Sequence, residues 1–447
     1  MTDPQESHLL SVRSLGHRGE GVGVQSQLVM FVDGALPQEI VEVEVTAQRK
    51  RFAEAKLLKV VQQSPDRIAP PCPLFGSCGG CQIQHLSYPG QLKAKQERVK
   101  ECLTRIGKFT DVHVEECIPS PDPFHWRHKV QMPAAAVDGK LVFGFYEKRT
   151  HTIVPVSTCL IHCDEGDKAM QALEEEANLL QITPYSETTG QGALRHILLK
   201  TSLSSKKTMA VFITNGREKG KMEKLAKRLM EKRPDVAGVF LSINKESGNT
   251  ILGNSFELLA GASTIQEELL GLRFTVSPAS FFQVNPAQAE NMYRKTLEFA
   301  APTNTTRVLD CYSGVGTMSL IMARQAGFVK GIEWVEAAVE DAYENSRLNA
   351  IANIEFKAGA VESISFRGES FDTVLLNPPR KGCDEKALKA ILNLAPATIV
   401  YTSCDPATLS RDLAALQAGG YRIEKVQPFD MFPQTMHVET VVKLSRL

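Results

Sequence analysis

The 447-residue sequence predicts an α/β protein with a Rossmann-like domain in its C-terminal half, a small OB-like β-barrel at its N-terminus and a mixed α/β region between them. Two patterns predict this architecture. From about residue 281 onward, short apolar runs alternate with segments of helical periodicity, which is typical of a doubly wound, mostly parallel sheet. Residues 8–62 instead show the two-residue alternation of half-buried strands. At roughly 150 residues per domain, the length suits three domains.

The N-terminal segment carries the signals of several short strands joined by tight turns. The run at residues 40–45 alternates apolar and acidic residues, and Asp33 and Gly34 supply turn chemistry before it. About five strands fit into this length, as in an OB-like barrel, which is a common RNA-binding platform. The alternative is a capping β-domain without a ligand.

Charge is distributed unevenly along the chain. Lysine and arginine number 51, as do aspartate and glutamate, so the net charge is zero and a polycation that coats nucleic acid nonspecifically is excluded. Residues 46–110, however, contain twelve basic and only four acidic side chains. The basic run at 49–51, with Lys56 and Lys59, favours contact with an RNA backbone. A solvated basic face is the alternative.

Hydrophobic periodicity predicts the remaining elements. Apolar positions at helical spacing, with basic residues between them, predict a helix over 91–107 whose lysines we expect to face solvent. Residues 110–270 are mixed α/β. Beyond them we expect, in order, helix 286–299, strand 306–310, helix 317–326, strand 329–333, helix 336–350, strand 371–377, helix 384–393 and strand 397–402.

Three features at the predicted carboxyl edge of this sheet indicate a nucleotide-like cofactor. The run at 308–316 is a strand followed by a Gly-rich turn and a helix, so the backbone can approach a ligand closely. Glu333 ends the next strand, where it can accept hydrogen bonds from ribose hydroxyls, and Asn377 brings a carboxamide to the same edge. The third glycine of a dinucleotide fingerprint is missing, so the set favours S-adenosylmethionine over NAD. Taken alone, Asn377 and the two prolines after it also suit a strand-ending turn.

A cysteine at the same edge is a candidate nucleophile. Cys404 follows the apolar strand at 398–401 and directly precedes a helix, whose N-terminus favours the thiolate. Glu439, in a short motif near the C-terminus, is the candidate proton acceptor that such a nucleophile needs. The alternatives are a buried structural thiol at Cys404 and a solvated carboxylate on an edge strand at Glu439.

Three further cysteines are spaced as ligands of one metal site. Cys72, Cys78 and Cys81 are close in sequence, and a fourth ligand has to come from elsewhere, with Cys159 and Cys163 both available. Four thiolates suit either zinc or an iron–sulfur cluster, and the spacing alone does not decide between them. We expect a structural site. Ordinary semi-buried thiols are expected at the other positions: Cys102, Cys117, Cys311 and Cys383.

No segment predicts a secreted or membrane-spanning protein. The N-terminal run MTDPQESHLL lacks a basic-then-apolar leader, and no apolar run approaches the ~20 residues of a bilayer span. We therefore expect a cytoplasmic protein whose ten cysteines are not paired in disulfides. No membrane contact and no obligate protein partner are evident.

Together these motifs closely resemble the RNA uracil-C5 methyltransferase family, which uses S-adenosylmethionine, and the resemblance covers nearly the whole chain. The barrel is similar to a TRAM domain, and the segment at 75–81 is similar to the family's cluster segment. Members with both features resemble the bacterial 23S ribosomal RNA enzymes, in which the cluster is [4Fe-4S]; the tRNA T-loop branch generally lacks them. In the family, a Cys-Leu-Ile type of segment supplies the fourth ligand, which selects Cys159 over Cys163.

The resemblance also implies a division into domains. It implies a TRAM RNA-binding barrel over 1–66, a central iron–sulfur domain over 67–90 and 122–272, and a Rossmann-like class I methyltransferase domain over 91–121 and 273–447. The central domain is then discontinuous, because the helix at 91–107 packs with the C-terminal domain.

Individual residue roles follow from the same resemblance. Cys404 is implied as the nucleophile and Glu439 as the base. The implied cofactor contacts are Gln283, Tyr312, Gly314, Glu333 and Asn377. The chain departs from the usual family residues at Asn377, commonly Asp, and at Asp405, commonly Asn.

The residue types suggest a reaction. Addition of the Cys404 thiolate to C6 of uracil makes C5 reactive towards a sulfonium methyl group, and Glu439 then removes the C5 proton to give 5-methyluridine. The target base has to be unstacked or flipped to reach the pocket. Two rivals remain: an N-methyltransferase acting on an exocyclic nitrogen, which would not need Cys404, and an RNA-binding assembly factor with a vestigial methyltransferase domain.

Overall fold

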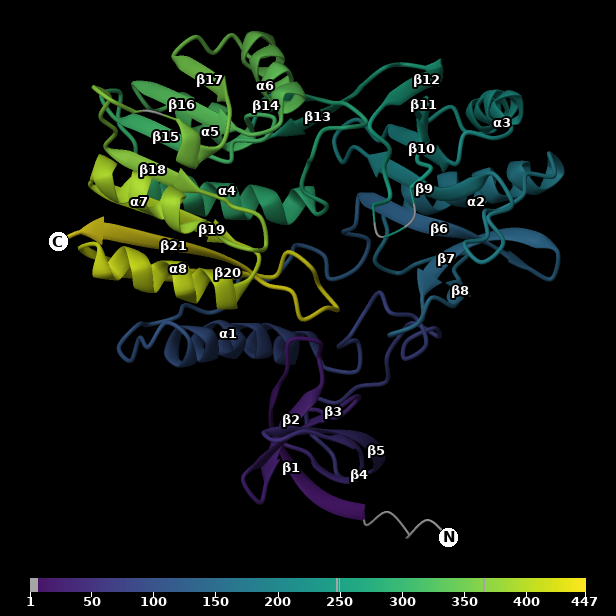
Figure 1. Cartoon of the computed structure of the whole chain (residues 1–447), viewed down its shortest axis with the longest axis horizontal. Helices are drawn as coiled ribbons and strands as arrows, with labels where there is room; N and C mark the ends of the chain where they lie inside the picture. Colours follow the sequence, from purple (N-terminus) through teal and green to yellow (C-terminus); the bar gives the residue numbers. More distant parts are fainter. Residues whose placement is uncertain (1–6, 247, 249, 365) are drawn as a thin grey trace.

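The structure, a computed structural model, contains a small barrel and two large sheets that lie side by side (Figure 1). It describes residues 7–246, 248, 250–364 and 366–447. Residues 1–6 lie outside this part of the chain. The expected barrel domain begins with them, and the expected lack of a leader rests partly on them. Among the described residues, no helix is both long enough and apolar enough to cross a bilayer.

The N-terminal strands close into a five-stranded barrel, as their alternation predicts. Apolar side chains that alternate along the strands, such as Leu10, Val12, Val41 and Val43, fill its interior. The strand order is β1-β2-β3-β5-β4. The strands are β1 (Ser7–Leu15), β2 (Gly21–Gln25), β3 (Leu28–Val32), β4 (Ile40–Gln48) and β5 (Phe52–Gln62).

The central region forms a seven-stranded sheet in the order β12-β11-β10-β9-β6-β7-β8. Two helices, α2 (Asp164–Leu179) and α3 (Lys219–Lys232), cover one face with buried apolar side chains. The mixed α/β character expected here is therefore confirmed. The strands are β6 (Lys129–Val137), β7 (Lys140–Tyr146), β8 (Ile153–Pro155), β9 (Leu194–Thr201), β10 (Thr208–Thr214), β11 (Val236–Ile243) and β12 (Phe256–Gly261).

The C-terminal region is the predicted doubly wound sheet, in the order β17-β16-β15-β18-β19-β21-β20. Its first five strands pair in parallel, and β21 runs antiparallel to both neighbours. The strands are β15 (Arg307–Cys311), β16 (Phe328–Glu333), β17 (Ile354–Ala358), β18 (Thr373–Leu376), β19 (Thr398–Ser403), β20 (Tyr421–Phe429) and β21 (Glu439–Arg446).

Helices and a hairpin complete this region. Every helix and strand expected beyond residue 281 is present, although helix 317–326 ends at Ala323. The short strand β17 and strand β20 were not predicted, whereas α8 is the helix expected directly after Cys404. The elements are the hairpin β13 (Ile265–Leu269) and β14 (Leu272–Val276), a 3₁₀ turn at Val361–Ser363, and the helices α4 (Pro286–Ala300), α5 (Thr317–Ala323), α6 (Glu336–Leu348), α7 (Glu385–Leu394) and α8 (Pro406–Ala418).

The helix expected over 91–107 is α1 (Tyr88–Arg105), and it packs along α8 and β20 between the barrel and the C-terminal sheet (Figure 1). The expectation that its lysines face solvent is wrong at Lys95. Lys95 lies one turn before the buried Val99, on the helix face that meets the sheet, and its side chain is 0% exposed. Its ammonium group pairs with the equally buried carboxylate of Asp430.

Candidate active site

A pocket lies at the carboxyl ends of β15 and β18. Tyr312 and Asn377 directly follow these neighbouring parallel strands, so both enter the pocket from the same edge of the sheet. Gln283 reaches it from the loop before α4. Four of the five implied cofactor contacts line this pocket: Gln283, Tyr312, Gly314 and Asn377.

The turn after β15 brings backbone rather than side chain to the pocket. Tyr312, Gly314 and Gly316 all have positive φ angles, of 70°, 56° and 81°. A Cβ atom on Gly316 would lie 2.8 Å from the ring of Phe356, so only glycine fits there. A Cβ atom on Gly314 would meet open space, which leaves room for a ligand above the turn.

Glu333 does not line the pocket itself but supports this turn. One carboxylate oxygen accepts a hydrogen bond from the backbone N–H of Gly314 (2.9 Å), and the other accepts one from Val335 (2.9 Å). Each oxygen keeps a second lone pair. The carboxylate can therefore accept a further hydroxyl at the pocket edge.

The sequence reasoning assigned no role to three other residues that line the pocket: Tyr293, Asp310 and Thr402. Asp310 ends up fully buried because it lies inside β15, and burial raises its pKa to about 7. The Ser319 hydroxyl donates to its carboxylate at 2.5 Å. Ser319 occupies the stretch where a dinucleotide fingerprint would place a third glycine, so this departure from the fingerprint serves to hold Asp310.

Sheet register brings Cys404 and Glu439 together. Ser403, the last residue of β19, pairs with Thr440 on β21, so Cys404 and Glu439 are the next residues beyond this last pair. The charge of Glu439 acts on the Cys404 thiol, so the two groups are close. The edge-strand alternative for Glu439 is wrong, because β21 lies between β19 and β20 and the residue is 5% exposed.

Burial shifts the ionisation of both groups, and the charge of Glu439 adds to the shift at Cys404. Burial, with the nearby Glu439 charge, raises the pKa of Cys404 to about 11. Burial raises the pKa of Glu439 to about 7, against an opposing effect of Arg380. Arg380 acts in the same lowering direction on Cys404, so it is the cation that favours both anions. The sequence placed Arg380 in the turn after Asn377 but gave it no role.

The loop that carries Arg380 is anchored on α8. Thr408 donates its hydroxyl to the Arg380 carbonyl oxygen (3.1 Å), and Arg411 donates to that of Lys381 (2.9 Å). At the start of α8, Asp405 caps the helix by accepting from the backbone N–H groups of Ala407 and Thr408 (2.9 and 3.0 Å). Asparagine would cap the helix in the same way, so the departure at Asp405 keeps this structural role.

The four cysteines implied as metal ligands line one cavity: Cys72, Cys78, Cys81 and Cys159. Cys163 does not line it; its sulfur lies beside Gly166, at the start of α2. Arg127, which is half-buried, also lines the cavity. Within the described residues, no three Cys, His, Asp or Glu side chains converge closely enough to bind a single metal ion. The thiols surround a space instead of meeting at a point.

The basic region at 46–110 is only partly available to a partner. The five side chains singled out in the barrel are exposed: Arg49, Lys50, Arg51, Lys56 and Lys59. Arg67, in contrast, is bound to the buried carboxylate of Glu39 (2.6 Å), and Lys95 is buried in α1. The exposed basic side chains therefore lie on the barrel and also on and after α1, where Lys93, Lys100, Arg105 and Lys108 are exposed.

Comparisons with known proteins agree with this arrangement. Residues 87–447 match the family model tRNA (Uracil-5-)-methyltransferase, and residues 9–58 match the TRAM domain. The chain is 40% identical to an uncharacterized RNA methyltransferase of Halalkalibacterium halodurans, over 97% of this chain and 96% of that protein. It is also 40% identical to one of Caldanaerobacter subterraneus, over 99% and 98%.

A solved structure resembles the whole chain. It is the tRNA (uracil-54, C5)-methyltransferase of Pyrococcus abyssi in complex with S-adenosyl-L-homocysteine, with a TM-score of 0.78 and 28% identity over 98% of this chain and 100% of that chain. The expected resemblance is confirmed by these matches. The chain belongs to the tRNA (uracil-5-)-methyltransferase family and carries a TRAM domain at its N-terminus.

Proposed function

We propose that this protein transfers a methyl group from S-adenosylmethionine to C5 of a uridine in 23S ribosomal RNA, through a covalent bond between Cys404 and C6 of the base. The observation that carries the proposal is that Cys404 and Glu439 follow directly on the last pair of the β19–β21 ladder. Cys404 lies two residues after Thr402, which lines the pocket with Gln283 and Asn377. An N-methyltransferase would need neither residue, and the family match favours C5 of uracil over an exocyclic nitrogen.

The cofactor pocket suits S-adenosylmethionine. When bound there, S-adenosylmethionine would supply an electrophilic methyl group for C5 of the base. Glu333 holds the turn at Gly314 and would accept the ribose hydroxyls on its remaining lone pairs. Gln283, Tyr312 and Asn377 would orient the donor from the pocket walls. The Pyrococcus abyssi relative is bound to S-adenosyl-L-homocysteine, the form of this donor without its methyl group.

In the proposed reaction, the Cys404 thiolate forms a bond to C6 and the electron pair of the C5–C6 double bond moves into an enolate. C5 then takes the methyl group as its bond to the sulfonium sulfur breaks, and S-adenosyl-L-homocysteine leaves. Glu439 accepts the C5 proton, the double bond reforms and the thiolate leaves as 5-methyluridine is released. Arg380 favours the thiolate that starts the sequence, because its positive charge opposes the rise in the pKa of Cys404.

The cysteine cavity suits a [4Fe-4S] cluster held by Cys72, Cys78, Cys81 and Cys159. The chemistry of the donor set fits, because such a cluster is bound by four thiolates and is wider than a single ion. Arg127 would offset part of its negative charge. When bound, the cluster supplies a cross-link between the segment before α1 and the one before α2, and we assign it no step of the methyl transfer.

The same proposal fixes the wider setting. We divide the chain into the TRAM barrel over 1–66, the central iron–sulfur domain over 67–90 and 122–272, and the methyltransferase domain over 91–121 and 273–447. RNA is the only macromolecular partner that the proposal requires, and ribosomal RNA places the enzyme in the cytoplasm. The second candidate substrate is a tRNA T-loop uridine, favoured by the substrate named for the Pyrococcus abyssi enzyme.

The test maps 5-methyluridine in the RNA of a strain that lacks the gene. Loss of the modification from one or more positions of 23S ribosomal RNA, restored by the wild-type gene but not by Cys404→Ala, would support the proposal. Loss from tRNA alone would favour the second candidate. Full restoration by Cys404→Ala would overturn the covalent mechanism, because that variant has no nucleophile.

A further inference from the structure

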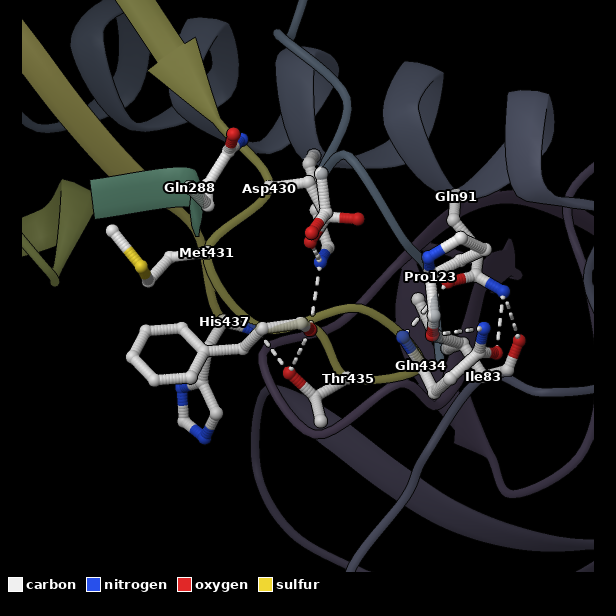
Figure 2. Close-up of polar contacts among 12 residues, drawn as sticks. Ile83, Gln91, Pro123, Gln288, Asp430, Met431, Gln434, Thr435 and His437 are labelled. Atoms are coloured by element: carbon white, nitrogen blue, oxygen red, sulfur yellow. Dashed lines mark hydrogen bonds and ion pairs between the residues drawn. The ribbon is translucent and has the colours of Figure 1, made fainter. Parts of the chain in front are cut away.

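The loop at 430–438 connects β20 to β21 and leads directly into Glu439. Buried polar contacts hold this loop along most of its length, although its contacting segments lie far away in the sequence (Figure 2). Gln434 lies at its tip, is 3% exposed and has a φ angle of 71°. A left-handed backbone is unfavourable at a non-glycine residue, and at Gln434 buried contacts hold it in place.

The backbone of Gln434 is bound to two distant segments. Its carbonyl oxygen accepts hydrogen bonds from the N–H groups of Gln82 (3.0 Å) and Ile83 (3.1 Å), which directly follow Cys81. Its own N–H donates to the side-chain oxygen of Gln91 on α1 (3.0 Å). The strained peptide is thus enclosed by partners on both sides.

The side chain of Gln434 extends the same network, as Figure 2 shows. Its amide nitrogen donates to the carbonyl oxygen of Pro123 (3.2 Å), and its oxygen accepts from the amide nitrogen of Gln91 (2.9 Å). That nitrogen of Gln91 also donates to the carbonyl oxygens of Ile83 (3.2 Å) and Leu86 (2.9 Å). Gln434 therefore joins four separate stretches of chain at one buried point.

The rest of the loop is anchored on α1 and on the cofactor motif. Lys95 pairs with Asp430 at the start of the loop and donates to the carbonyl oxygen of Phe432 (3.0 Å). Asn285, two residues after Gln283, donates to the carbonyl oxygen of Met431 (3.1 Å). These contacts fix the first half of the loop, while Gln434 fixes the point from which the chain returns towards Glu439.

Glu439 needs such support because it is the first residue of β21. Its partner Phe429 is the last residue of β20, so the ladder ends at this pair and strand fraying would begin here. Fraying would move the Glu439 carboxylate from its buried site into water. Because burial disfavours the charged form, this move is favourable for the carboxylate. A fixed loop keeps the end of the ladder closed.

We propose that Gln434 is a positioning residue that holds the Glu439 carboxylate close to Cys404 by tying the loop at 430–438 to α1 and to the segment after Cys81. The proposal rests on the proposed function, in which Glu439 removes the C5 proton after methyl transfer. Loss of Gln434 then slows the resolution of the methylated adduct and leaves its formation intact. A purely structural residue would affect both steps together.

The test compares Gln434→Leu and Gln91→Leu with the wild type on RNA that contains the substrate uridine. Methyl-labelled RNA–protein adduct and free 5-methyluridine are followed over time on denaturing gels. Because a misplacement of about 1 Å can cost about 100-fold in rate, we expect resolution to slow by about 10- to 100-fold. Adduct formation and S-adenosylmethionine affinity should stay within about two-fold of the wild type. Gln91→Leu removes both hydrogen bonds between α1 and Gln434. It tests the positioning role if Gln434→Leu does not fold.

Two controls separate the possible failures. Gln181→Leu is the matched control, since Gln181 also has a left-handed backbone (φ 51°) but is exposed after α2, far from these contacts in sequence. It should behave as the wild type. If the wild type forms no adduct on 5-fluorouridine RNA, the proposed function itself is wrong. Suppose instead that the wild type forms this adduct and Glu439→Gln accumulates methylated adduct. The positioning role is then wrong if both loop variants resolve the adduct at the wild-type rate. It is also wrong if they lose adduct formation and resolution equally.

Discussion

The ionisation of Glu439 should control how fast the methylated adduct is resolved. Burial raises the pKa of this carboxyl to about 7, so about half of it is protonated at neutral pH and about nine-tenths at pH 6. Only the carboxylate can accept the C5 proton. We therefore expect resolution to slow about ten-fold between pH 8 and pH 6, whereas a glutamate with the ordinary pKa of about 4.3 would give a nearly flat profile.

The assay must separate this step from the attack of Cys404, which also depends on pH. The pKa of Cys404 is raised to about 11, so the thiolate fraction falls with decreasing pH as well. The two effects move the amount of adduct in opposite directions, because slow attack depletes it and slow resolution accumulates it. Methyl-labelled adduct is therefore formed at pH 8 and transferred to buffers of pH 6 to 8 with excess unlabelled S-adenosylmethionine, and its decay is followed on denaturing gels. The attack of Cys404 then does not enter the measured rate.

We expect this decay to slow about ten-fold as the pH falls from 8 to 6, and release of tritium from adduct formed on RNA labelled at C5 of uridine to slow in parallel. The adduct of Glu439→Gln should decay slowly at every pH, since this variant has no carboxylate to ionise. A decay rate in the wild type that does not change between pH 8 and pH 6 would refute the reasoning. It would mean that another group removes the C5 proton or that bound RNA restores an ordinary pKa to Glu439.

Three further predictions concern other parts of the molecule. Protein isolated without oxygen should be brown and hold about four irons per chain; Cys159→Ser should lose the colour and Cys163→Ser should keep it, while stoichiometric zinc would contradict the cluster. Replacing the exposed basic residues at 49–51 with alanine should weaken RNA binding and reduce the slope of log affinity against log salt by about 2, with S-adenosylmethionine affinity unchanged. Finally, Glu439→Gln should raise the melting temperature at pH 8 but not at pH 4: the folded-state pKa of about 7 exceeds the unfolded value of 4.5, so burial of the carboxylate costs about 3 kcal/mol above pH 7 and nothing below pH 4.5.

Sequence periodicity predicted the C-terminal sheet well because the elements there are long and regular. Buried parallel strands such as β15 and β18 read as short, mostly apolar runs, and the turns after them bring Tyr312 and Asn377 to one edge. Helix α8 was expected directly after Cys404, where Asp405 and Pro406 form an ordinary helix start. Strand β20 was missed.

The environment of Glu439 could not be read from the sequence in the same way. Its proximity to Cys404 follows from the register of β21 between β19 and β20, and a β-strand pattern does not reveal its neighbours in a sheet. Lys95 illustrates the same limit, since its expected place on a solvated helix face was overturned by a partner on the loop after β20. Contacts between residues far apart in sequence are tertiary information.

Two features that oppose folding, at Glu439 and Gln434, lie close together on the loop at 430–438 and the strand that follows it. The buried contacts of this loop are concentrated around them. Burial of the Glu439 carboxylate opposes folding above neutral pH, and the left-handed peptide at Gln434 adds to that cost. Both features lie within six residues of each other, on a loop with buried hydrogen bonds to α1, to the segment after Cys81 and to the cofactor motif. The chain thus stabilises the loop from three sides in order to keep one strand end closed over an unfavourable charge. A proton acceptor that has to work next to a thiol, out of water, requires such support, and the same carboxylate placed in solvent would be stable but poorly matched to its step.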